Sequence, residues 1–272
     1  MARAVPEFVH AGDVRIAYER AGVGPPLVLM HGAEANRQMF AALVPLLAPR
    51  FTVIAYDQRD CGDTEVLAHA ATLADLADDA AALIRGLGHD RAHVFGSSFG
   101  GRVAQALALL HPERVDRLVL ASTWPLPHAY DALYPEGAAR IGELRARLPE
   151  SAEELAGWFL PEPFLRERPD LRRIFAGARA QTERSRRRAQ TVASTLDRSP
   201  AAIKAPTLVI AGELDRVVPA RLTMQLADAI PDCERTLLAG VGHVTVMQAT
   251  TQVAAALTEF LSTMEADHAG RR

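Results

Sequence analysis

The residue best placed for chemistry is a serine in a short glycine-rich run. The run Val-Phe-Gly-Ser-Ser-Phe-Gly-Gly carries the pattern G-x-S-x-G around Ser98. An apolar stretch at 93–97 precedes it, and apolar residues at helical spacing follow it over 99–110. A serine on such a strand-to-helix bend is a nucleophile elbow, and Gly96 and Gly100 are expected where a Cβ would clash with the neighbouring strand and helix. We therefore predict that Ser98 is a nucleophile, in preference to a plain glycine-rich turn.

A serine hydroxyl is a weak nucleophile and needs a general base, a role that histidine commonly fills. In elbow enzymes the partners follow in the order Ser, Asp, His, with the histidine in a loop after the last strand. His243 fits this place, because Gly-Val-Gly-His lies between a predicted strand at 234–238 and a predicted helix at 246–260. His111 ends a helix, and His268 lies in the tail. We predict His243 as the base, in preference to an ordinary surface-loop histidine.

The third partner must be a carboxylate that orients the imidazole and stabilises the imidazolium. Asp215 lies in the loop that leaves a predicted strand at 207–211, and Glu213 lies two residues earlier. Some elbow enzymes carry the acid after the preceding strand, but there this chain has Ser-Thr-Trp at 122–124, without a carboxylate. We predict Asp215 as the acid. Glu213 is the alternative, and because it is closer to the strand it is expected to hold the loop.

An attack on a carbonyl also needs two N–H groups aimed at the oxyanion that develops. The residue after the nucleophile, Phe99, supplies one at the start of its helix, where the helix dipole helps. The second is expected from the loop His31-Gly32-Ala33, which follows a predicted strand at 27–30. We predict Ala33 as this second donor.

The elements that position these residues follow from the spacing of apolar side chains. Strands are predicted at 8–9 and 14–18, which form a hairpin, and at 27–30, 51–56, 93–97, 117–121, 207–211 and 234–238. Helices are predicted at 39–47, 72–87, 99–110 and 246–260, and Thr72 is expected to cap the second. Such alternation predicts the α/β class, with a mostly parallel twisted sheet and helices on both faces.

One region breaks the alternation. Between two predicted core strands, residues 125–200 contain no strong strand, and their helical patterns are interrupted by prolines. We predict a core domain of residues 1–124 and 201–272 and a helical lid inserted at 125–200. Such an insertion would lie over the carboxyl ends of the parallel strands, where α/β sheets bind ligands.

These motifs resemble those of the α/β-hydrolase fold superfamily. The matching elements are His31-Gly32, Asp57-Gln58-Arg59, the elbow at 96–101, Asp215 and His243, in the family order. The resemblance implies the α/β-hydrolase fold, and within the superfamily the chain is similar to single-domain esterases, enol-lactonases and carbon–carbon bond hydrolases. In relatives the second motif reads D-x-R-G-x-G, whereas here Asp60 stands for the first glycine, so a differently bent turn is expected.

Signals for the substrate are fewer. Glu34 follows Ala33 and is expected to face the pocket, and Ser97 is smaller than the residue that many relatives carry there, which leaves space beside the nucleophile. Trp124 stands where core and insertion meet, as a pocket wall or as a packed aromatic residue. The basic run at 184–188 is typical of a solvated helix face; the alternative is steering of a carboxylate-bearing substrate.

Composition limits the partners. The chain has 272 residues, 49% of them hydrophobic, and a net charge of −3, which does not favour nucleic acid or an anionic membrane. The two cysteines do not indicate a disulfide scaffold, no His/Cys/Asp cluster has metal-ligand spacing, and no cofactor is expected. The N-terminus lacks an apolar signal core, so a soluble cytoplasmic protein is expected. The sequence leaves open whether the chain forms a homodimer.

We predict a serine hydrolase that cleaves a small ester or lactone through an acyl-enzyme intermediate. The first alternative is hydrolysis of a carbon–carbon bond in a vinylogous 1,5-diketone, in which His243 would first assist ketonisation. The second is a ligand-binding hydrolase homologue without catalysis.

Overall fold

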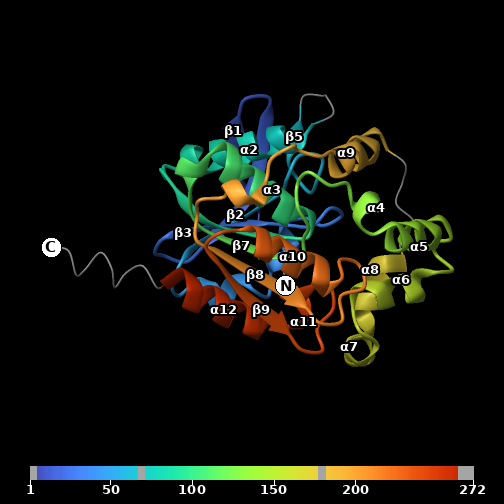
Figure 1. Ribbon diagram of the computed structural model, residues 1–272. Coiled ribbons are helices and arrows are strands. Elements are labelled where there is room, and N and C mark those ends of the chain that lie inside the picture. Colours follow the sequence, from blue (N-terminus) through green and yellow to red (C-terminus); the bar gives the residue numbers. More distant parts are fainter. Residues whose placement is uncertain (1–4, 67–70, 177–181, 263–272) are drawn as a thin grey trace.

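The computed structural model describes residues 5–66, 71–176 and 182–262, and the strands in these ranges form one sheet (Figure 1). The strands are β1 (Glu7–Ala11), β2 (Val14–Ala21), β3 (Pro26–Met30), β4 (Thr52–Tyr56), β5 (Glu65–Val66), β6 (Ala92–Ser97), β7 (Val115–Ala121), β8 (Thr207–Gly212) and β9 (Cys233–Leu238). Their order across the sheet is β1-β2-β4-β3-β6-β7-β8-β9, with β5 paired to β2.

The sheet is mostly parallel. β1 and β2 form the predicted antiparallel hairpin, and β2 also runs antiparallel to β4. From β4 through β3, β6, β7 and β8 to β9, every neighbouring pair is parallel. The carboxyl ends of these strands therefore lie along one edge, which is where α/β sheets bind ligands. The predicted mostly parallel sheet of the α/β class is confirmed.

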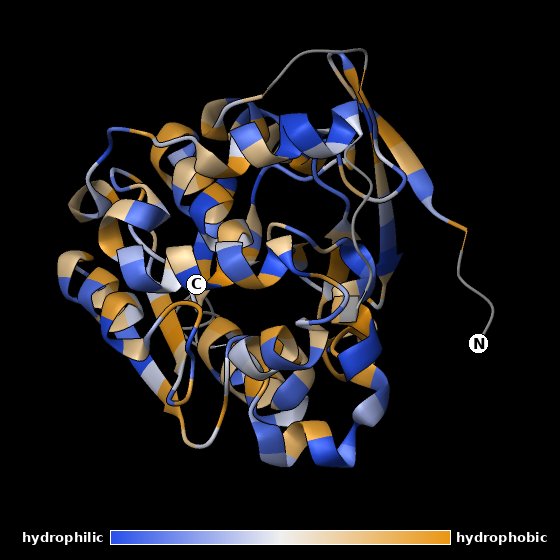
Figure 2. Cartoon of the chain, turned by 90° about the vertical axis from the view of Figure 1, so that its right-hand side faces the viewer, coloured by the Kyte–Doolittle hydropathy of each residue, from blue (hydrophilic) through white to orange (hydrophobic). Residues whose placement is uncertain are grey.

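Helices cover both faces of the sheet (Figure 1). Those of the core are α1 (Val44–Leu47), α2 (Leu73–Gly86), α3 (Phe99–Leu110), α10 (Ala220–Ala229), α11 (Thr245–Gln248) and α12 (Thr250–Ser262). Side chains alternate along each strand, so Val28 and Met30 pack with α2 and α3, whereas Leu27 and Leu29 pack with α1 and α12. In Figure 2 the helices alternate between hydrophilic and hydrophobic residues, as expected for helices with one buried side.

Local signals account for where α2 begins. The Thr72 side chain accepts a hydrogen bond from the Asp75 N–H, and the Asp75 carboxylate accepts one from the Thr72 N–H. This capping box satisfies two N–H groups that the first helical turn leaves without partners. Past the end of the helix, Gly88 has a φ of +82°, which glycine adopts without strain.

Two helices that were predicted as continuous are each interrupted in the structure. The segment predicted as 39–47 is a 3₁₀ turn at Arg37–Phe40 followed by the short α1, because Pro45 lacks the N–H that a continuous helix would need there. The segment predicted as 246–260 is split into α11 and α12 at Ala249, whose φ is −120°. The two-residue strand β5 was not predicted, because it is too short to show alternation.

Between β7 and β8 lie the inserted helices, α4 (Tyr130–Leu133), α5 (Pro135–Ala146), α6 (Ala152–Phe159), α7 (Glu162–Glu167), α8 (Arg172–Ala176) and α9 (Glu183–Ala193). Figure 1 shows α4 to α8 gathered at one end of the sheet, with α9 above α4. No strand occurs among the residues that are described in this segment. Arg102 joins its two ends, because the guanidinium donates to the Leu126 and Ser194 carbonyls. A lid function for these helices stays a prediction.

The turn from β6 to α3 is built by close backbone contacts. Ser98 has φ +55° and ψ −121°, a conformation that costs L-residues energy. A Cβ on Gly96 would lie 2.4 Å from the Gly100 carbonyl oxygen, and one on Gly100 would lie 2.1 Å from the Met30 carbonyl oxygen. The steric reason predicted for both glycines therefore holds for this turn.

Replacing Gly100 with alanine tests this packing. The Gly100→Ala substitution should lower the free energy of unfolding by more than about 2 kcal/mol, because backbone on β3 must move. The matched control is Gly142→Ala in α5, where a Cβ meets no atom within 4 Å and should stabilise the chain by about 0.5–1 kcal/mol. Urea unfolding of both variants checks this, and equal effects would contradict the account.

Candidate active site

Three side chains that are far apart in the sequence meet at the carboxyl edge of the sheet. Ser98 follows β6, Asp215 follows β8 and His243 follows β9. His243 Nε2 lies 3.0 Å from Ser98 Oγ, and His243 Nδ1 lies 2.9 Å from Asp215 Oδ2. Asp215 and His243 are buried, and Ser98 is half-buried. The structure thus brings together the three residues that the sequence singled out.

The hydrogen bonds fix the direction in which a proton can move. The ionised Asp215 carboxylate can only accept, so His243 Nδ1 carries the hydrogen and Nε2 of the neutral ring accepts from Ser98 Oγ. The other carboxylate oxygen of Asp215, Oδ1, accepts from the Val217 and Val218 N–H groups at 2.9 and 2.8 Å. These two bonds hold the carboxylate in place behind the imidazole.

Glu213 has a different place. Its Oε2 accepts a hydrogen bond from the Gly240 N–H at 2.8 Å, so it ties the loop after β8 to the loop that carries His243. Gln248 completes this link: its Nε2 donates to the Gly240 carbonyl, and its Oε1 accepts from the Gly242 N–H. The expectation that Glu213 holds the loop agrees with these contacts, and of the two acids it is Asp215 that is hydrogen-bonded to His243.

The strained backbone of Ser98 is held by the neighbouring strand β7. The Ser98 N–H donates to the Ala121 carbonyl at 2.8 Å, and the Ser98 carbonyl accepts from Thr123 Oγ1 at 2.7 Å. Gly101, in the first turn of α3, lies against Thr123, where a Cβ would come within 2.6 Å of the threonine Cβ. The serine side chain is therefore presented by a rigid support.

The loop after β3 lies beside the serine. A Cβ on Gly32 would be 3.6 Å from Ser98 Cβ, which places the loop in van der Waals range of the nucleophile. Within the described ranges, neither the Ala33 N–H nor the Phe99 N–H donates to a backbone carbonyl. Phe99 directly follows Ser98, and Ala33 directly follows the glycine that lies beside it, so both N–H groups stay candidates for the oxyanion site.

His31 is buried and shapes this loop. Its Nδ1 lies 2.8 Å from the Gly32 carbonyl, and its Nε2 accepts from the Gln58 N–H at 3.1 Å. The ring is thus neutral with the hydrogen on Nδ1. Burial is the main reason that the pKa of His31 is lowered to about 4, and the Arg188 charge lowers it further. The Gln58 side chain also donates to the His31 carbonyl at 2.7 Å.

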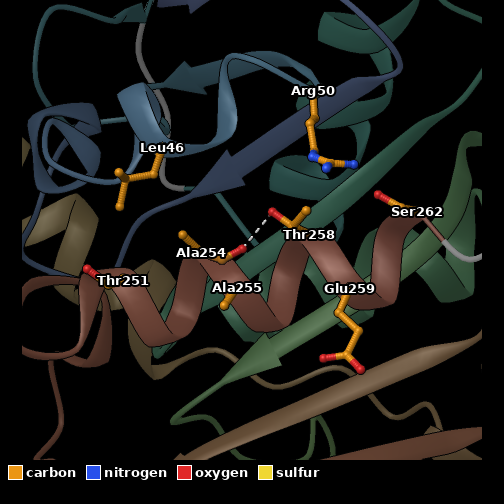
Figure 3. A pocket seen from close by; sticks show the side chains of 8 residues that line it. All are labelled: Leu46, Arg50, Thr251, Ala254, Ala255, Thr258, Glu259 and Ser262. Atoms are coloured by element: carbon orange, nitrogen blue, oxygen red, sulfur yellow. Dashed lines mark hydrogen bonds between the residues drawn. The ribbon is translucent and has the colours of Figure 1, made fainter.

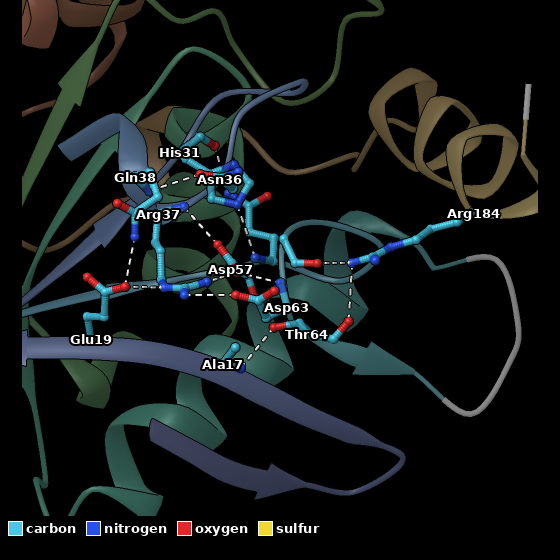
Figure 4. Close-up of polar contacts among 12 residues, drawn as sticks. Ala17, Glu19, His31, Asn36, Arg37, Gln38, Asp57, Asp63, Thr64 and Arg184 are labelled. Carbon is cyan, nitrogen blue, oxygen red and sulfur yellow. Dashed lines mark hydrogen bonds and ion pairs between the residues drawn. The ribbon is translucent and has the colours of Figure 1, made fainter. Parts of the chain in front are cut away.

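The Asp57 motif anchors the loops around the site (Figure 4). The Asp57 carboxylate accepts from the Arg37 N–H and the Asp63 N–H, each at 2.7 Å, and pairs with the Arg37 guanidinium. Arg37 is fully buried and also binds Glu19 at 2.8 Å. Asp60 has a φ of +59°, the left-handed conformation that glycine adopts more easily, and its carboxylate pairs with Arg187 at 2.6 Å.

The predicted substrate-binding residues have three different environments. Glu34 forms an ion pair with Arg145 of α5 at 3.0 Å, and both side chains are about 40% exposed. Ser97 is buried, and its hydroxyl has no hydrogen-bond partner among the described residues. Trp124 is buried between core and inserted helices, where its ring lies 5.3 Å from that of Tyr130. The packed-aromatic interpretation of Trp124 agrees with this; a role in substrate binding stays a prediction for all three.

The expectation of a solvated basic helix is wrong for most of the 184–188 run. Arg184 donates to the carbonyls of Gly62 and Thr64, and Arg187 pairs with Asp60 (Figure 4 shows Arg184). Arg188 is buried. Charge pattern alone suggested solvent, because the carbonyls and the carboxylate that these side chains bind lie more than a hundred residues earlier in the chain.

Two residues of the inserted helices contact the site without any signal in the sequence. The Phe159 carbonyl accepts from the His243 N–H at 2.9 Å, and the Phe159 ring lies 5.6 Å from the imidazole, edge to face. The Tyr130 hydroxyl donates to the carbonyl of Val217, two residues after Asp215, and burial together with the Asp215 charge raises the pKa of Tyr130. The insertion thus contributes to the surroundings of the histidine and the acid.

The surface also carries a groove that is separate from the residues described above. A surface groove of about 570 Å³ lies between α12 and the end of α1, lined by Leu46, Arg50, Thr258 and their neighbours (Figure 3). None of the predicted site residues lines it. In the described part of the chain, no group of three His, Cys, Asp or Glu side chains could hold a metal ion, and no helix is long and apolar enough to cross a membrane.

A serine at a strand-to-helix turn, hydrogen-bonded to a histidine and aligned with a carboxylate on one edge of a parallel sheet, defines an α/β protein of the nucleophile-elbow class. A family model described as alpha/beta hydrolase fold matches residues 25–250. The chain therefore belongs to the α/β-hydrolase fold family.

Similar proteins carry several hydrolase names. The chain is 31% identical to a 2-hydroxymuconate semialdehyde hydrolase of Pseudomonas sp. (strain CF600), over 96% of this chain and 94% of that protein. It is 28% identical to a protein of Caulobacter sp. (strain K31) named as a carbamate hydrolase, over 93% and 98%. The solved structure of a thermophilic esterase from Thermogutta terrifontis matches with a TM-score of 0.79 at 27% identity, covering 95% of this chain and 98% of that chain.

The lowered pKa of His31 predicts how stability depends on pH. The unfolded chain binds a proton on this residue near pH 6.5, whereas the folded chain keeps it neutral down to about pH 4. Stability that is present above pH 6.5 is therefore lost as the pH falls to 4, by up to about 3 kcal/mol. In His31→Gln the decrease in the free energy of unfolding between pH 6.5 and pH 4 should be smaller by this contribution of about 3 kcal/mol. Urea unfolding at several pH values measures both, and identical slopes would contradict the assignment.

Proposed function

We propose that the chain is a serine hydrolase that cleaves an ester or a lactone through an acyl-enzyme. The observation that carries the proposal is the pair of hydrogen bonds from Ser98 Oγ to His243 Nε2 and from His243 Nδ1 to Asp215. This pair joins a nucleophile to a base whose other nitrogen is oriented by a carboxylate, which is the arrangement that activates a serine.

The first half of the reaction forms the acyl-enzyme. His243 Nε2 takes the proton from Ser98 Oγ while the oxygen attacks the substrate carbonyl carbon. The electron pair of the carbonyl moves to its oxygen, and the N–H groups of Ala33 and Phe99 donate to this oxyanion. When the oxyanion collapses, the bond to the leaving alkoxy group breaks, and the imidazolium gives its proton to the leaving oxygen. In a lactone the alcohol stays joined to the acyl chain.

The second half releases the acid. A water molecule loses a proton to His243 Nε2 and attacks the acyl carbonyl, which gives a second oxyanion at the same two N–H groups. This intermediate collapses with cleavage of the bond to Ser98 Oγ, which recovers its proton from the imidazolium. Asp215 stays ionised throughout and stabilises the charged imidazole in both halves, because its Oδ1 is already held by two backbone N–H groups.

The relatives support a hydrolytic function and favour one alternative. A thermophilic esterase of similar structure supports cleavage at an acyl carbonyl. The likeness to a 2-hydroxymuconate semialdehyde hydrolase over nearly the whole chain favours, as the second candidate, hydrolysis of a carbon–carbon bond in a vinylogous 1,5-diketone. In that reaction His243 would assist ketonisation before the bond breaks. A binding protein without catalysis is the third candidate.

Removing the Ser98 hydroxyl tests the proposal against these alternatives. The wild type should hydrolyse p-nitrophenyl acetate and small lactones and should be labelled on Ser98 by a fluorophosphonate. The Ser98→Ala substitution should remove the labelling and reduce kcat by a factor on the order of 10⁴ or more, because the nucleophile is lost.

The same assays separate the candidates. Turnover of a coloured meta-cleavage product without turnover of esters would favour the carbon–carbon hydrolase. No labelling of folded wild type would favour the binding protein, and undiminished esterase activity in Ser98→Ala would overturn the proposal.

The two acidic residues of the loop after β8 give a matched pair. Asp215→Asn should lower kcat by roughly 10⁴-fold, because the amide no longer holds the hydrogen on Nδ1 of His243. Glu213→Gln should keep kcat within about tenfold, because its oxygen can still accept from the Gly240 N–H. Steady-state kinetics with p-nitrophenyl acetate measures both variants. The reverse ranking would identify Glu213 as the acid.

A further inference from the structure

Arg188 of α9 is a buried cation beside the loop that carries Ala33. Only 7% of the surface of Arg188 is exposed. Its Nε donates to the Ala33 carbonyl at 3.0 Å, and Nη2 donates to Gln58 Oε1 at 2.9 Å. Its Cζ lies 4.8 Å from the centre of the Phe99 ring. One side chain of the insertion thus contacts both residues whose N–H groups are proposed to hold the oxyanion.

Among the residues that the structure describes, no carboxylate is paired with this charge. Within the described ranges Arg188 forms no ion pair, and its Nη1 is buried without a hydrogen-bond partner. Its neighbours on α9 differ: Arg187 pairs with Asp60, and Arg184 binds two carbonyls. Burying an unpaired charge is unfavourable, so docking of the helix alone does not account for Arg188. A negative charge that forms nearby during a reaction would be stabilised by it.

The contacts of Arg188 continue to the start of the same loop. Gln58, which accepts from the guanidinium, donates its side-chain N–H to the His31 carbonyl at 2.7 Å and its backbone N–H to His31 Nε2 at 3.1 Å. Arg188 therefore holds the loop directly at Ala33 and through Gln58 at His31. Between these two points lies Gly32, which is next to Ser98.

We propose that Arg188 is a positioning residue for the oxyanion site. When α9 is docked, its guanidinium fixes the Ala33 end of the loop and places a positive charge behind the Ala33 and Phe99 N–H groups. Docking of the insertion thereby completes the catalytic site of the core. This inference rests on the proposed attack by Ser98 on a carbonyl.

The test measures the rate of covalent labelling at Ser98, which does not depend on the natural substrate. A neutral alkyl fluorophosphonate places its phosphoryl oxygen where the oxyanion would form. Arg188→Met should slow the second-order labelling rate by about ten- to a hundredfold, because the donors are no longer held and the charge is gone. Arg188→Lys keeps the charge and can reach one of the two acceptors. Its labelling rate should therefore lie between those of the wild type and Arg188→Met and differ at least threefold from each.

Arg184→Met is the matched control on the same helix. It removes a guanidinium that binds the Gly62 and Thr64 carbonyls but does not touch the Ala33 loop. Its labelling rate should stay within about threefold of the wild type. With p-nitrophenyl acetate, Arg188→Met should lose kcat and keep KM within about twofold, because the interaction acts on the developing charge.

The outcomes distinguish this inference from the proposed function. Equal labelling rates in Arg188→Met and Arg184→Met, or an Arg188→Lys variant no faster than Arg188→Met, would overturn the positioning role. If Arg188→Met fails to fold, Arg188→Lys decides, and a wild-type rate in that variant overturns the role. Wild-type protein that is folded but not labelled at Ser98 would overturn the proposed function itself.

Discussion

The left-handed backbone of Ser98 is the constraint on which the rest of the site depends. It is sustained by hydrogen bonds to β7 and by glycines at 96 and 100 that let β3, β6 and α3 approach within a distance that no Cβ allows. A strained residue persists only when its surroundings determine it more strongly than its own preference does. This support places the Ser98 hydroxyl 3.0 Å from Nε2 of the His243 imidazole.

Buried charge organises the loops around this elbow. Three of the buried arginines have different sets of partners: Arg37 binds carboxylates of the core, Arg102 binds carbonyls at both ends of the insertion, and Arg188 binds the loop beside the serine. Charge-assisted hydrogen bonds are stronger and more directional than neutral ones. They therefore set the relative positions of segments that apolar packing alone would hold less specifically.

Local patterns in the sequence predict most of the core elements and few of the contacts made by the insertion. The strands, the elbow, Asp215 and His243 follow from apolar alternation and from loops at strand ends, because a parallel sheet brings those loops to one edge. The break at Ala249, the 3₁₀ turn at Arg37–Phe40, and the roles of Phe159 and Arg188 depend on contacts between distant segments. For Arg188 the charge pattern predicted solvent, since nothing near it in the sequence shows the Ala33 carbonyl that it binds.

The most direct test of the central claim is to trap the acyl group on the protein. Turnover of a slowly hydrolysed p-nitrophenyl ester would be quenched with acid and the protein digested with trypsin, which releases residues 92–102 between Arg91 and Arg102. The account predicts that this peptide gains the mass of the acyl group and that fragmentation places it on Ser98 rather than Ser97. Turnover with the acyl group on another residue, or with none on Ser98, would contradict it.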